Sequence, residues 1–192
     1  MLTRPSYLPL LHRIFHIMKK LFKSLTALVA LVTSSCLGNQ GKMVAPPYDA
    51  PAVSSVDQDG NPIHFADIYK KGITVVYFYP KADTPGCTKQ GCSLRDAYAD
   101  LTSQGVTVLG VSTDGPEANK KFKDKYKLPF TLVCDPEGKV LEAFKVAKMP
   151  VVGLATRQCF LIKDGKVVWH DAKASTEKQA DDIKAVLADL KK

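Results

Sequence analysis

The sequence predicts an α/β domain with a mixed central sheet and helices on both faces. Two observations lead to this fold class. Strand patterns alternate with helical patterns through the middle of the chain, and a hairpin pattern followed by a helix comes near its end. Residues 53–192 hold these patterns, and a segment of this length forms one domain with a core of its own.

Three runs of β-branched and aromatic residues predict strands that are buried on both faces. They are Ile73–Pro80, Val106–Thr113 and Phe130–Cys134. Two further strand patterns, QCFLIK and KVVWH, lie on either side of Asp164-Gly165. Because an Asp-Gly pair suits a two-residue turn, these two strands are expected to form a β-hairpin.

Apolar residues at helical spacing predict four helices around these strands. The helices run from Thr84–Pro85 to Gly105, from Asp114–Pro116 to Leu128–Pro129, and over Val140–Phe144 and Thr176–Leu190. With the strands, they complete a three-layer α/β arrangement.

Residues 1–36 have the pattern of a secretory signal segment. Basic residues follow Met18, an apolar stretch covers Leu25–Val32, and small residues precede Cys36. The apolar stretch is far shorter than the roughly 20 residues that span a bilayer. We therefore expect export to the periplasm or cell envelope, with Met18 as the true start of translation.

Cys36 also ends a pattern that resembles a bacterial lipoprotein box, although Thr33 stands where an aliphatic residue is usual. Lipid attachment at Cys36 and simple cleavage nearby both remain open. Residues 37–52 are rich in Gly, Pro and Ala without any period, so they predict a linker between the signal segment and the domain.

The charge of the chain gives little support to a nucleic-acid partner. The formal net charge is +8, but five of the 27 basic residues and none of the 19 acidic residues lie in residues 1–36. Residues 37–192 therefore carry a net charge of only +3, and they have no basic run with interleaved aromatic residues. We expect no nucleic-acid binding.

Cys87 and Cys92 lie five positions apart in the segment TPGCTKQGC. This spacing matches neither a zinc site nor a Cys-x-x-Cys dithiol. If a helix begins near Pro85, Cys87 lies in its first turn, where unpaired N–H groups and the helix dipole favour a reactive thiolate.

An intact helix would keep the two sulfur atoms apart. Five residues correspond to roughly 140° around the helix axis and about 7.5 Å along it, which does not fit disulfide geometry. The helix must unwind locally before the sulfurs can join, and Gly91 lowers the cost of this by about 1 kcal/mol relative to Ala. This pattern suits oxidation of Cys87 to a sulfenic acid that Cys92 then captures.

The segment Tyr79–Asp96, YPKADTPGCTKQGCSLRD, closely resembles the active-site segment of peroxiredoxins. The resemblance is to the bacterioferritin comigratory protein (peroxiredoxin Q) group, which are thioredoxin-fold thiol peroxidases of the AhpC/TSA type. Pro80, Thr84 and Cys87 match the Pro-x3-Thr-x2-Cys motif, and Cys92 matches the resolving position. The likeness continues through VLGVSTD, LPFTLVCDPEGKV and RQCFLIKDGKVV, so it covers nearly all of the domain.

The resemblance implies a thioredoxin-like fold and a peroxidase that reduces hydrogen peroxide and small organic hydroperoxides. Cys87 would be the peroxidatic nucleophile, and Cys92 would resolve it by an intramolecular disulfide. Thr84 would hydrogen-bond the thiolate and substrate besides capping the helix, and Pro80 would shield the pocket from water. Arg157 would favour the thiolate and stabilise charge on the departing oxygen.

The resemblance implies no metal ion and no organic cofactor, and it suggests a monomer. Reducing equivalents would come from a thioredoxin-like protein or a small thiol, although the cytosolic thioredoxin pool is not available to an exported protein. Cys134 and Cys159 depart from the family pattern, in which Ser or Thr is usual. We expect core thiols at both positions, with a disulfide between them as the alternative.

Two other functions compete with this interpretation. A copper-handling thioredoxin-fold lipoprotein would use Cys-x3-Cys with a distant His, whereas four residues separate Cys87 and Cys92. A non-catalytic envelope domain would keep the fold and lose the chemistry. Peroxide consumption separates the second alternative from an enzyme.

Overall fold

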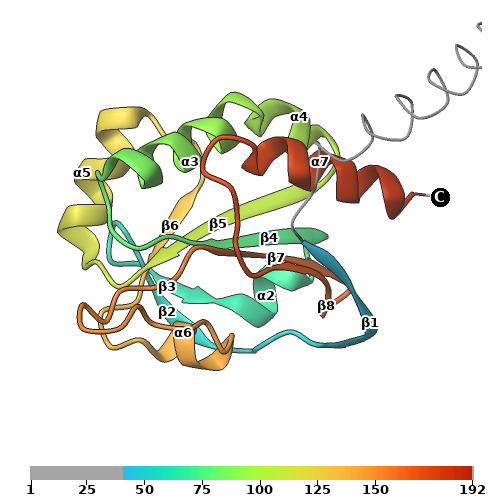
Figure 1. Cartoon of the computed structure of the whole chain (residues 1–192), viewed down its shortest axis with the longest axis horizontal. Helices are drawn as coiled ribbons and strands as arrows, with labels where there is room; N and C mark the ends of the chain where they lie inside the picture. Colours follow the sequence, from blue (N-terminus) through green and yellow to red (C-terminus); the bar gives the residue numbers. More distant parts are fainter. Residues whose placement is uncertain (1–40, 192) are drawn as a thin grey trace, which may run out of the picture. The chain divides into compact units, whose positions relative to one another are not determined.

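The computed structural model describes residues 41–191, which form an eight-stranded mixed sheet with helices on both faces (Figure 1). The strand order is β1-β8-β7-β4-β5-β6-β2-β3. The strands are β1 (Lys42–Asp49), β2 (Ser54–Asp57), β3 (Pro62–His64), β4 (Ile73–Phe78), β5 (Val106–Ser112), β6 (Thr131–Cys134), β7 (Gln158–Lys163) and β8 (Lys166–Asp171). This confirms the predicted fold class.

The sheet combines a parallel centre with antiparallel flanks. Strands β4, β5 and β6 are parallel neighbours, whereas β7, β8 and β1 extend the sheet antiparallel beyond β4. Strands β2 and β3 extend the opposite edge beyond β6. The predicted hairpin is present, and Asp164 and Gly165 form its turn with positive φ angles.

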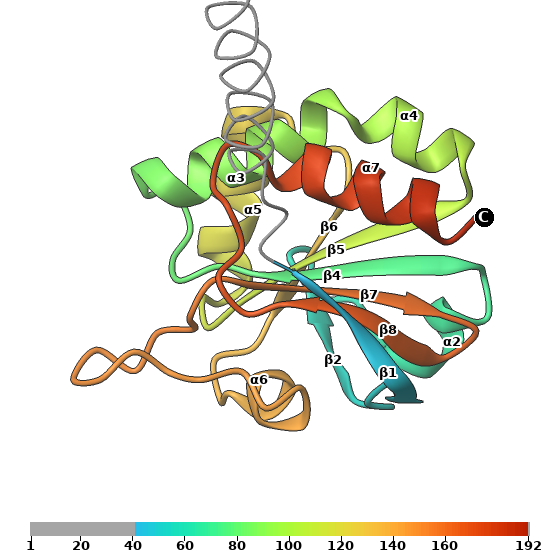
Figure 2. The same cartoon turned by 45° about the vertical axis from the view of Figure 1, so that its right-hand side comes forward.

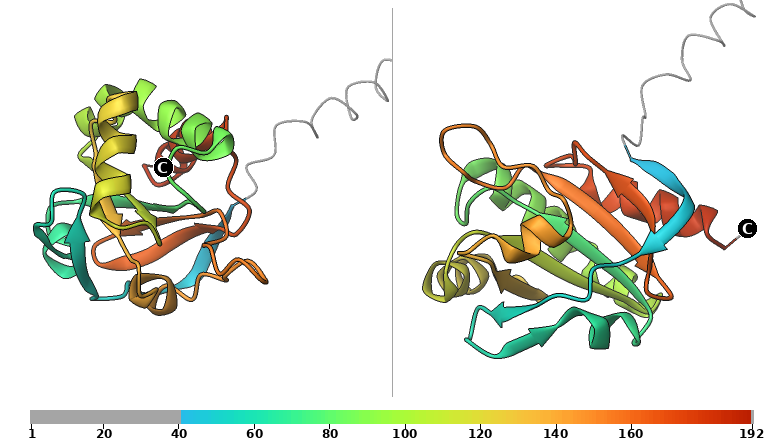
Figure 3. Two further views of the ribbon diagram at one scale, coloured as in Figure 1. Left: turned by 90° about the vertical axis from the view of Figure 1, so that its left-hand side faces the viewer. Right: turned by 90° about the horizontal axis from the view of Figure 1, so that it is seen from below.

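The helices are α2 (Phe65–Tyr69), α3 (Pro85–Asp96), α4 (Tyr98–Ser103), α5 (Pro116–Tyr126), α6 (Lys139–Ala143) and α7 (Gln179–Asp189). Helices α3, α4 and α7 lie together on one side of the sheet (Figure 2). Helices α2 and α6 lie on the other side, in front of the sheet when it is seen from below (Figure 3).

The central strand β4 separates two hydrophobic core clusters. Its side chains alternate, so that Val75 and Tyr77 pack in the cluster under α3 and α7, while Val76 and Phe78 pack in the cluster over α2 and α6. All four are buried. The continuous apolar run that predicted this strand therefore reflects burial on both faces.

The linker predicted for residues 37–52 is wrong for Lys42–Asp49, which form the edge strand β1 and pair with β8. Pro46 and Pro47 interrupt the strand pattern, and the register of the pairing shifts where they lie. Prolines are tolerated here because an edge strand needs hydrogen-bond donors on only one side. Strands β2 and β3 and helix α2 were also not predicted.

The single helix predicted between Thr84–Pro85 and Gly105 is interrupted at Ala97, where α3 ends and α4 begins. The N–H of Ala97 still bonds to the carbonyl of Ser93 at 3.3 Å, but with φ −96° and ψ 0° Ala97 itself departs from helical geometry. Leu94 and Leu101 nevertheless reach the same core cluster, so the apolar spacing continued across the break.

The predicted signal segment 1–36, with Met18 and Cys36, lies outside the described residues. Within residues 41–191, no helix is both long enough and apolar enough to cross a membrane.

Candidate active site

The site lies where β4 leads into α3. Thr84 occupies the N-cap position, Pro85 begins the helix, and Cys87 is in the first turn with only 1% of its surface exposed. The first backbone hydrogen bond of the helix runs from the N–H of Thr88 to the carbonyl of Thr84, at 2.8 Å. The N–H groups of Gly86 and Cys87 precede this bond, so they lack acceptors within the helix and can face an anion.

Arg157 lies directly against Cys87. Its Nη2 is 3.5 Å from Sγ of Cys87, and its Nη1 donates a hydrogen bond to Oε1 of Gln90. Arg157 immediately precedes β7, and Gln158 pairs with Phe78 at the end of β4. Antiparallel pairing thus brings a residue 70 positions away in sequence to the start of α3.

The structure gives the side chain of Thr84 a different contact from the predicted one. Its hydroxyl donates to the carbonyl of Lys81 at 3.0 Å, and no hydrogen bond among the described residues joins it to Cys87 or caps the helix. A threonine hydroxyl readily bonds a carbonyl three residues earlier in a turn, which competes with the other roles. Pro80 is half-buried and lies two residues beyond the end of β4, directly after the fully buried Tyr79.

Gln90 belongs to the site, although sequence reasoning did not single it out. It is fully buried, accepts a hydrogen bond from Arg157, and donates from Nε2 to Oε1 of Gln179 at 2.8 Å. It lies three positions after Cys87, and residues at this spacing share a helix face. The spacing of three residues from Cys87 was therefore the one feature of the sequence that could have indicated that Gln90 lies beside Cys87.

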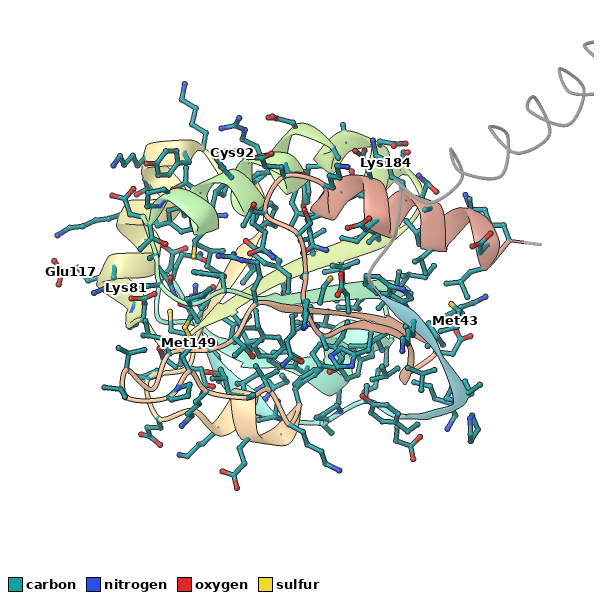
Figure 4. The ribbon with its side chains drawn as sticks, viewed as in Figure 1. Met43, Lys81, Cys92, Glu117, Met149 and Lys184 are labelled. Carbon is teal, nitrogen blue, oxygen red and sulfur yellow. The ribbon has the colours of Figure 1, made fainter. Side chains whose placement is uncertain are left out.

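Cys92 lies on the same helix as Cys87, and both cysteines are free thiols. Its side chain is partly exposed, and Figure 4 labels it on the upper side of the molecule. Because α3 is continuous from Pro85 to Asp96, the two sulfurs belong to one intact helix, in which the Cys-x4-Cys spacing does not permit a disulfide.

Cys134 and Cys159 are free and buried, as expected for core thiols. The alternative of a disulfide between them is wrong, because their strands β6 and β7 are separated in the sheet by β4 and β5. Burial raises the pKa of both thiols, and for Cys159 the neighbouring Asp171 raises it further. Both thiols are therefore poor nucleophiles in the folded protein.

Cation ligands do not gather anywhere in the described part of the chain. Within residues 41–191, no group of three or more His, Cys, Asp or Glu side chains is placed to hold a metal ion.

Comparison with known proteins identifies the family. Residues 45–170 match the model of the AhpC/TSA family. The chain is 37% identical over 143 residues to the chloroplastic peroxiredoxin Q of Sedum lineare, which covers 73% of this chain and 76% of that protein. The peroxiredoxin Q of Suaeda salsa is also 37% identical, covering 73% of this chain and 66% of that protein.

Solved structures give the same result. The peroxidoxin BcpB of Mycobacterium tuberculosis matches with a TM-score of 0.68 and 29% identity, over 74% of this chain and 95% of that one. The bacterioferritin comigratory protein of Xanthomonas campestris matches with a TM-score of 0.68 and 25% identity, over 79% of this chain and 98% of that one. These matches agree with the buried cysteine beside an arginine at the start of α3. The chain belongs to the AhpC/TSA family and is a peroxiredoxin of the peroxiredoxin Q group, an enzyme that reduces hydroperoxides with thiols.

Proposed function

We propose that Cys87 is the peroxidatic nucleophile and that Arg157 activates it. The observation that carries this proposal is the 3.5 Å contact between Nη2 of Arg157 and the buried Sγ of Cys87 in the first turn of α3. A guanidinium and unpaired N–H groups stabilise a thiolate there. They also stabilise the negative charge that develops on the departing oxygen of the peroxide.

The first step is a two-electron oxidation of sulfur by the hydroperoxide. The Cys87 thiolate attacks the terminal oxygen, the O–O bond breaks, and an S–O bond forms to give the sulfenic acid. The departing oxygen takes up a proton and leaves as water or an alcohol. Pro80, two residues beyond the end of β4, would keep bulk water out of this reaction.

Thr84 would bind the peroxide in this step. Its hydroxyl would have to rotate away from the carbonyl of Lys81, which it contacts in the structure. A hydroxyl both donates and accepts, so it can bridge a thiolate and a peroxide oxygen.

The second step joins Cys87 to Cys92. The Cys92 thiol attacks the sulfenic sulfur, a disulfide forms, and the hydroxyl leaves as water. Because both residues lie on α3, this step requires the helix to unwind between them. An external dithiol then attacks the disulfide, so that both cysteines return to the thiol form and the donor becomes oxidised.

We propose hydrogen peroxide and small organic hydroperoxides as substrates and a thioredoxin-like protein or small thiol as the reductant. The alkyl peroxide reduction activity of the Xanthomonas campestris protein supports organic hydroperoxides. A copper-handling function has less support, because the matching relatives are peroxiredoxins.

Peroxide consumption with a thiol reductant tests these roles in wild type, Cys87→Ser and Cys92→Ser. We expect Cys87→Ser to lose activity, and equal rates for Cys87→Ser and wild type would refute the proposal. After one equivalent of peroxide, intact mass should show a disulfide in wild type and a sulfenic acid in Cys92→Ser. An intramolecular disulfide in Cys92→Ser would assign the resolving role to another cysteine.

Export of the chain and lipid attachment at Cys36 stay proposals that rest on the sequence pattern alone. The mass of the mature protein isolated from cells tests both, because cleavage before Cys36 with added acyl chains differs from simple cleavage. A mature chain that keeps residues 18–35 would contradict export by this signal.

A further inference from the structure

The first turn of α7 and the residues just before it hold the middle of α3 through polar contacts. We call this set the α3–α7 clamp. It consists of an ion pair between Lys89 Nζ and Glu177 Oε1 at 2.6 Å, a hydrogen bond from Gln90 Nε2 to Gln179 Oε1 at 2.8 Å, and a hydrogen bond from Ala180 N to Ser93 Oγ at 3.3 Å. The ion pair is exposed, whereas both glutamines of the clamp are fully buried.

The buried hydrogen bonds run in series from Arg157 to Gln90 and on to Gln179. Arg157 decides which group donates and which accepts in each of them. A guanidinium has donors only, so Gln90 must turn its carbonyl oxygen toward Arg157 and its NH2 group away. Since Gln90 is fully buried, this NH2 group needs an acceptor inside the protein, and Oε1 of Gln179 supplies it. This series of hydrogen bonds ends at Nε2 of Gln179, which is buried and has no hydrogen-bond partner among the described residues.

We propose that Gln179 is a positioning residue for the peroxidase reaction. It contacts neither Cys87 nor Arg157 by a hydrogen bond, but it fixes the amide of Gln90 in the orientation that Arg157 requires. Without this acceptor, the amide of Gln90 can rotate, and Arg157 loses the partner that holds it against Cys87. This inference rests on the proposed roles of Cys87 and Arg157.

The same hydrogen bond opposes the second step of the reaction. Gln90 lies between Cys87 and Cys92, in the part of α3 that must unwind before the disulfide forms. Its bond to Gln179 must break during this unwinding, because Gln179 belongs to a different helix. Gln179 therefore speeds the attack on peroxide and slows the formation of the disulfide.

Opposite changes in two rates test this role in the full-length chain. In Gln179→Met, which keeps the bulk and removes the acceptor, we expect the rate constant for attack on hydrogen peroxide to fall about tenfold. We expect disulfide formation to become about fivefold faster. Rapid mixing and acid quenching followed by mass spectrometry measures both rates. Gln179→Glu keeps an oxygen acceptor and should restore most of the attack rate.

One further variant separates the positioning role of Gln179 from a general loss of stability, and another serves if Gln179→Met does not fold. Val186→Ala removes a buried side chain from α7 outside the clamp, so it should destabilise the helix and leave the attack rate within about twofold. Gln179→Asn keeps the amide but shortens the side chain, and it replaces Gln179→Met if that variant does not fold.

Attack rates within about twofold of wild type in the Met or Asn variant would overturn the inference, as would an equal loss of rate in Val186→Ala. The failure of the proposed function would look different, since Cys87→Ser would then still consume peroxide.

Discussion

At the scale of single residues, the proposed mechanism depends on how closely the guanidinium of Arg157 approaches Cys87. The side chain serves two partners at once, with Nη1 on Gln90 and Nη2 on Sγ of Cys87. A planar fork of donors can do this, whereas the single ammonium of a lysine is a compact point charge. Charge alone therefore does not account for the arrangement.

Substitution of Arg157 tests this requirement for shape. We expect Arg157→Lys to lower the rate constant for peroxide attack by about 10²-fold, and Arg157→Met by up to about 10³-fold, with the fold retained. Stopped-flow measurement with hydrogen peroxide gives these rates. A rate for Arg157→Lys within a factor of about three of wild type would show that charge is sufficient.

Gly86 leaves the space that the guanidinium occupies. A Cβ atom at this position would lie 3.2 Å from Nη2 of Arg157 and 3.5 Å from Cγ2 of Thr176, so the arginine would have to move. We expect Gly86→Ala to slow peroxide attack about tenfold, because a displaced guanidinium stabilises the charge in the transition state much less than an aligned one. Gly115→Ala is the matched control, since nothing lies within 4 Å of the added Cβ at the start of α5. Equal rates in the two variants would contradict this expectation.

The sequence identified some site residues and not others for a physical reason. The spacing of Cys87 and Cys92 at an expected helix start indicated redox chemistry, and the resemblance to peroxiredoxins added Pro80, Thr84 and Arg157 as predictions. Gln90 and Gln179 were not predicted as site residues because a glutamine on a helix is usually exposed to solvent. Both are buried only because α7 packs on α3, and this contact joins segments 89 residues apart.

At the scale of elements, the sequence predicted correctly the strands and helices whose residues are both suited to that local structure and buried in the fold. Long β-branched runs gave β4, β5 and β6, since these strands are buried on both faces. Strand β1 escaped prediction because its two prolines and mostly exposed side chains resemble a linker. The break at Ala97 left the apolar spacing of α3 and α4 unchanged, so the sequence contained no sign of it.

In the proposed mechanism, α3 must hold Cys87 in place for the attack on peroxide and must then unwind so that the disulfide can form. Gly91 lies in the segment that has to unwind. A Cβ added there would make ordinary contacts at 3.5 Å with Leu128 and 3.6 Å with Phe122, so alanine fits without strain. We expect Gly91→Ala to stabilise α3 by about 1 kcal/mol and to slow disulfide formation about fivefold.

The slower disulfide has a second consequence that mass spectrometry can measure. The sulfenic acid of Cys87 would persist longer, so excess peroxide should convert more of it to the sulfinic acid than in wild type. Quenched samples over a range of peroxide concentrations give the sulfinic fraction. Faster disulfide formation in Gly91→Ala, or less sulfinic acid, would show that unwinding of this turn does not limit resolution.

At the scale of the whole molecule, the ion pairs on the surface contribute little to the dependence of stability on pH. The carboxylates of these pairs are well exposed, and such pairs are worth about 0–1 kcal/mol each. Asp182 in the first turn of α7 is different. Burial raises its pKa from 3.8 to about 6, and the neighbouring Asp171 and Asp181 add to the increase, while Lys178 opposes it.

The sign of this effect follows from proton binding. Between about pH 4 and pH 6 the folded protein holds a proton on Asp182 that the unfolded chain has lost, so stability decreases as the pH rises through this window. Above it, the charged carboxylate destabilises the fold. We expect Asp182→Asn to increase the free energy of unfolding at about pH 8 by about 1 kcal/mol, a value reduced because the side chain is partly solvated.

Urea unfolding at two pH values measures this increase and checks its origin. At about pH 4 the carboxyl of Asp182 is protonated in the folded state, so replacement by the neutral amide should change stability far less than at about pH 8. Asp181→Asn is the comparison, because this exposed neighbour in the same turn is only a minor cause of the raised pKa of Asp182, so its replacement should increase stability at about pH 8 much less than Asp182→Asn does. An equal gain at both pH values in Asp182→Asn would mean that the amide acts through packing or hydrogen bonding. The charge of Asp182 would then not be what destabilises the fold at about pH 8.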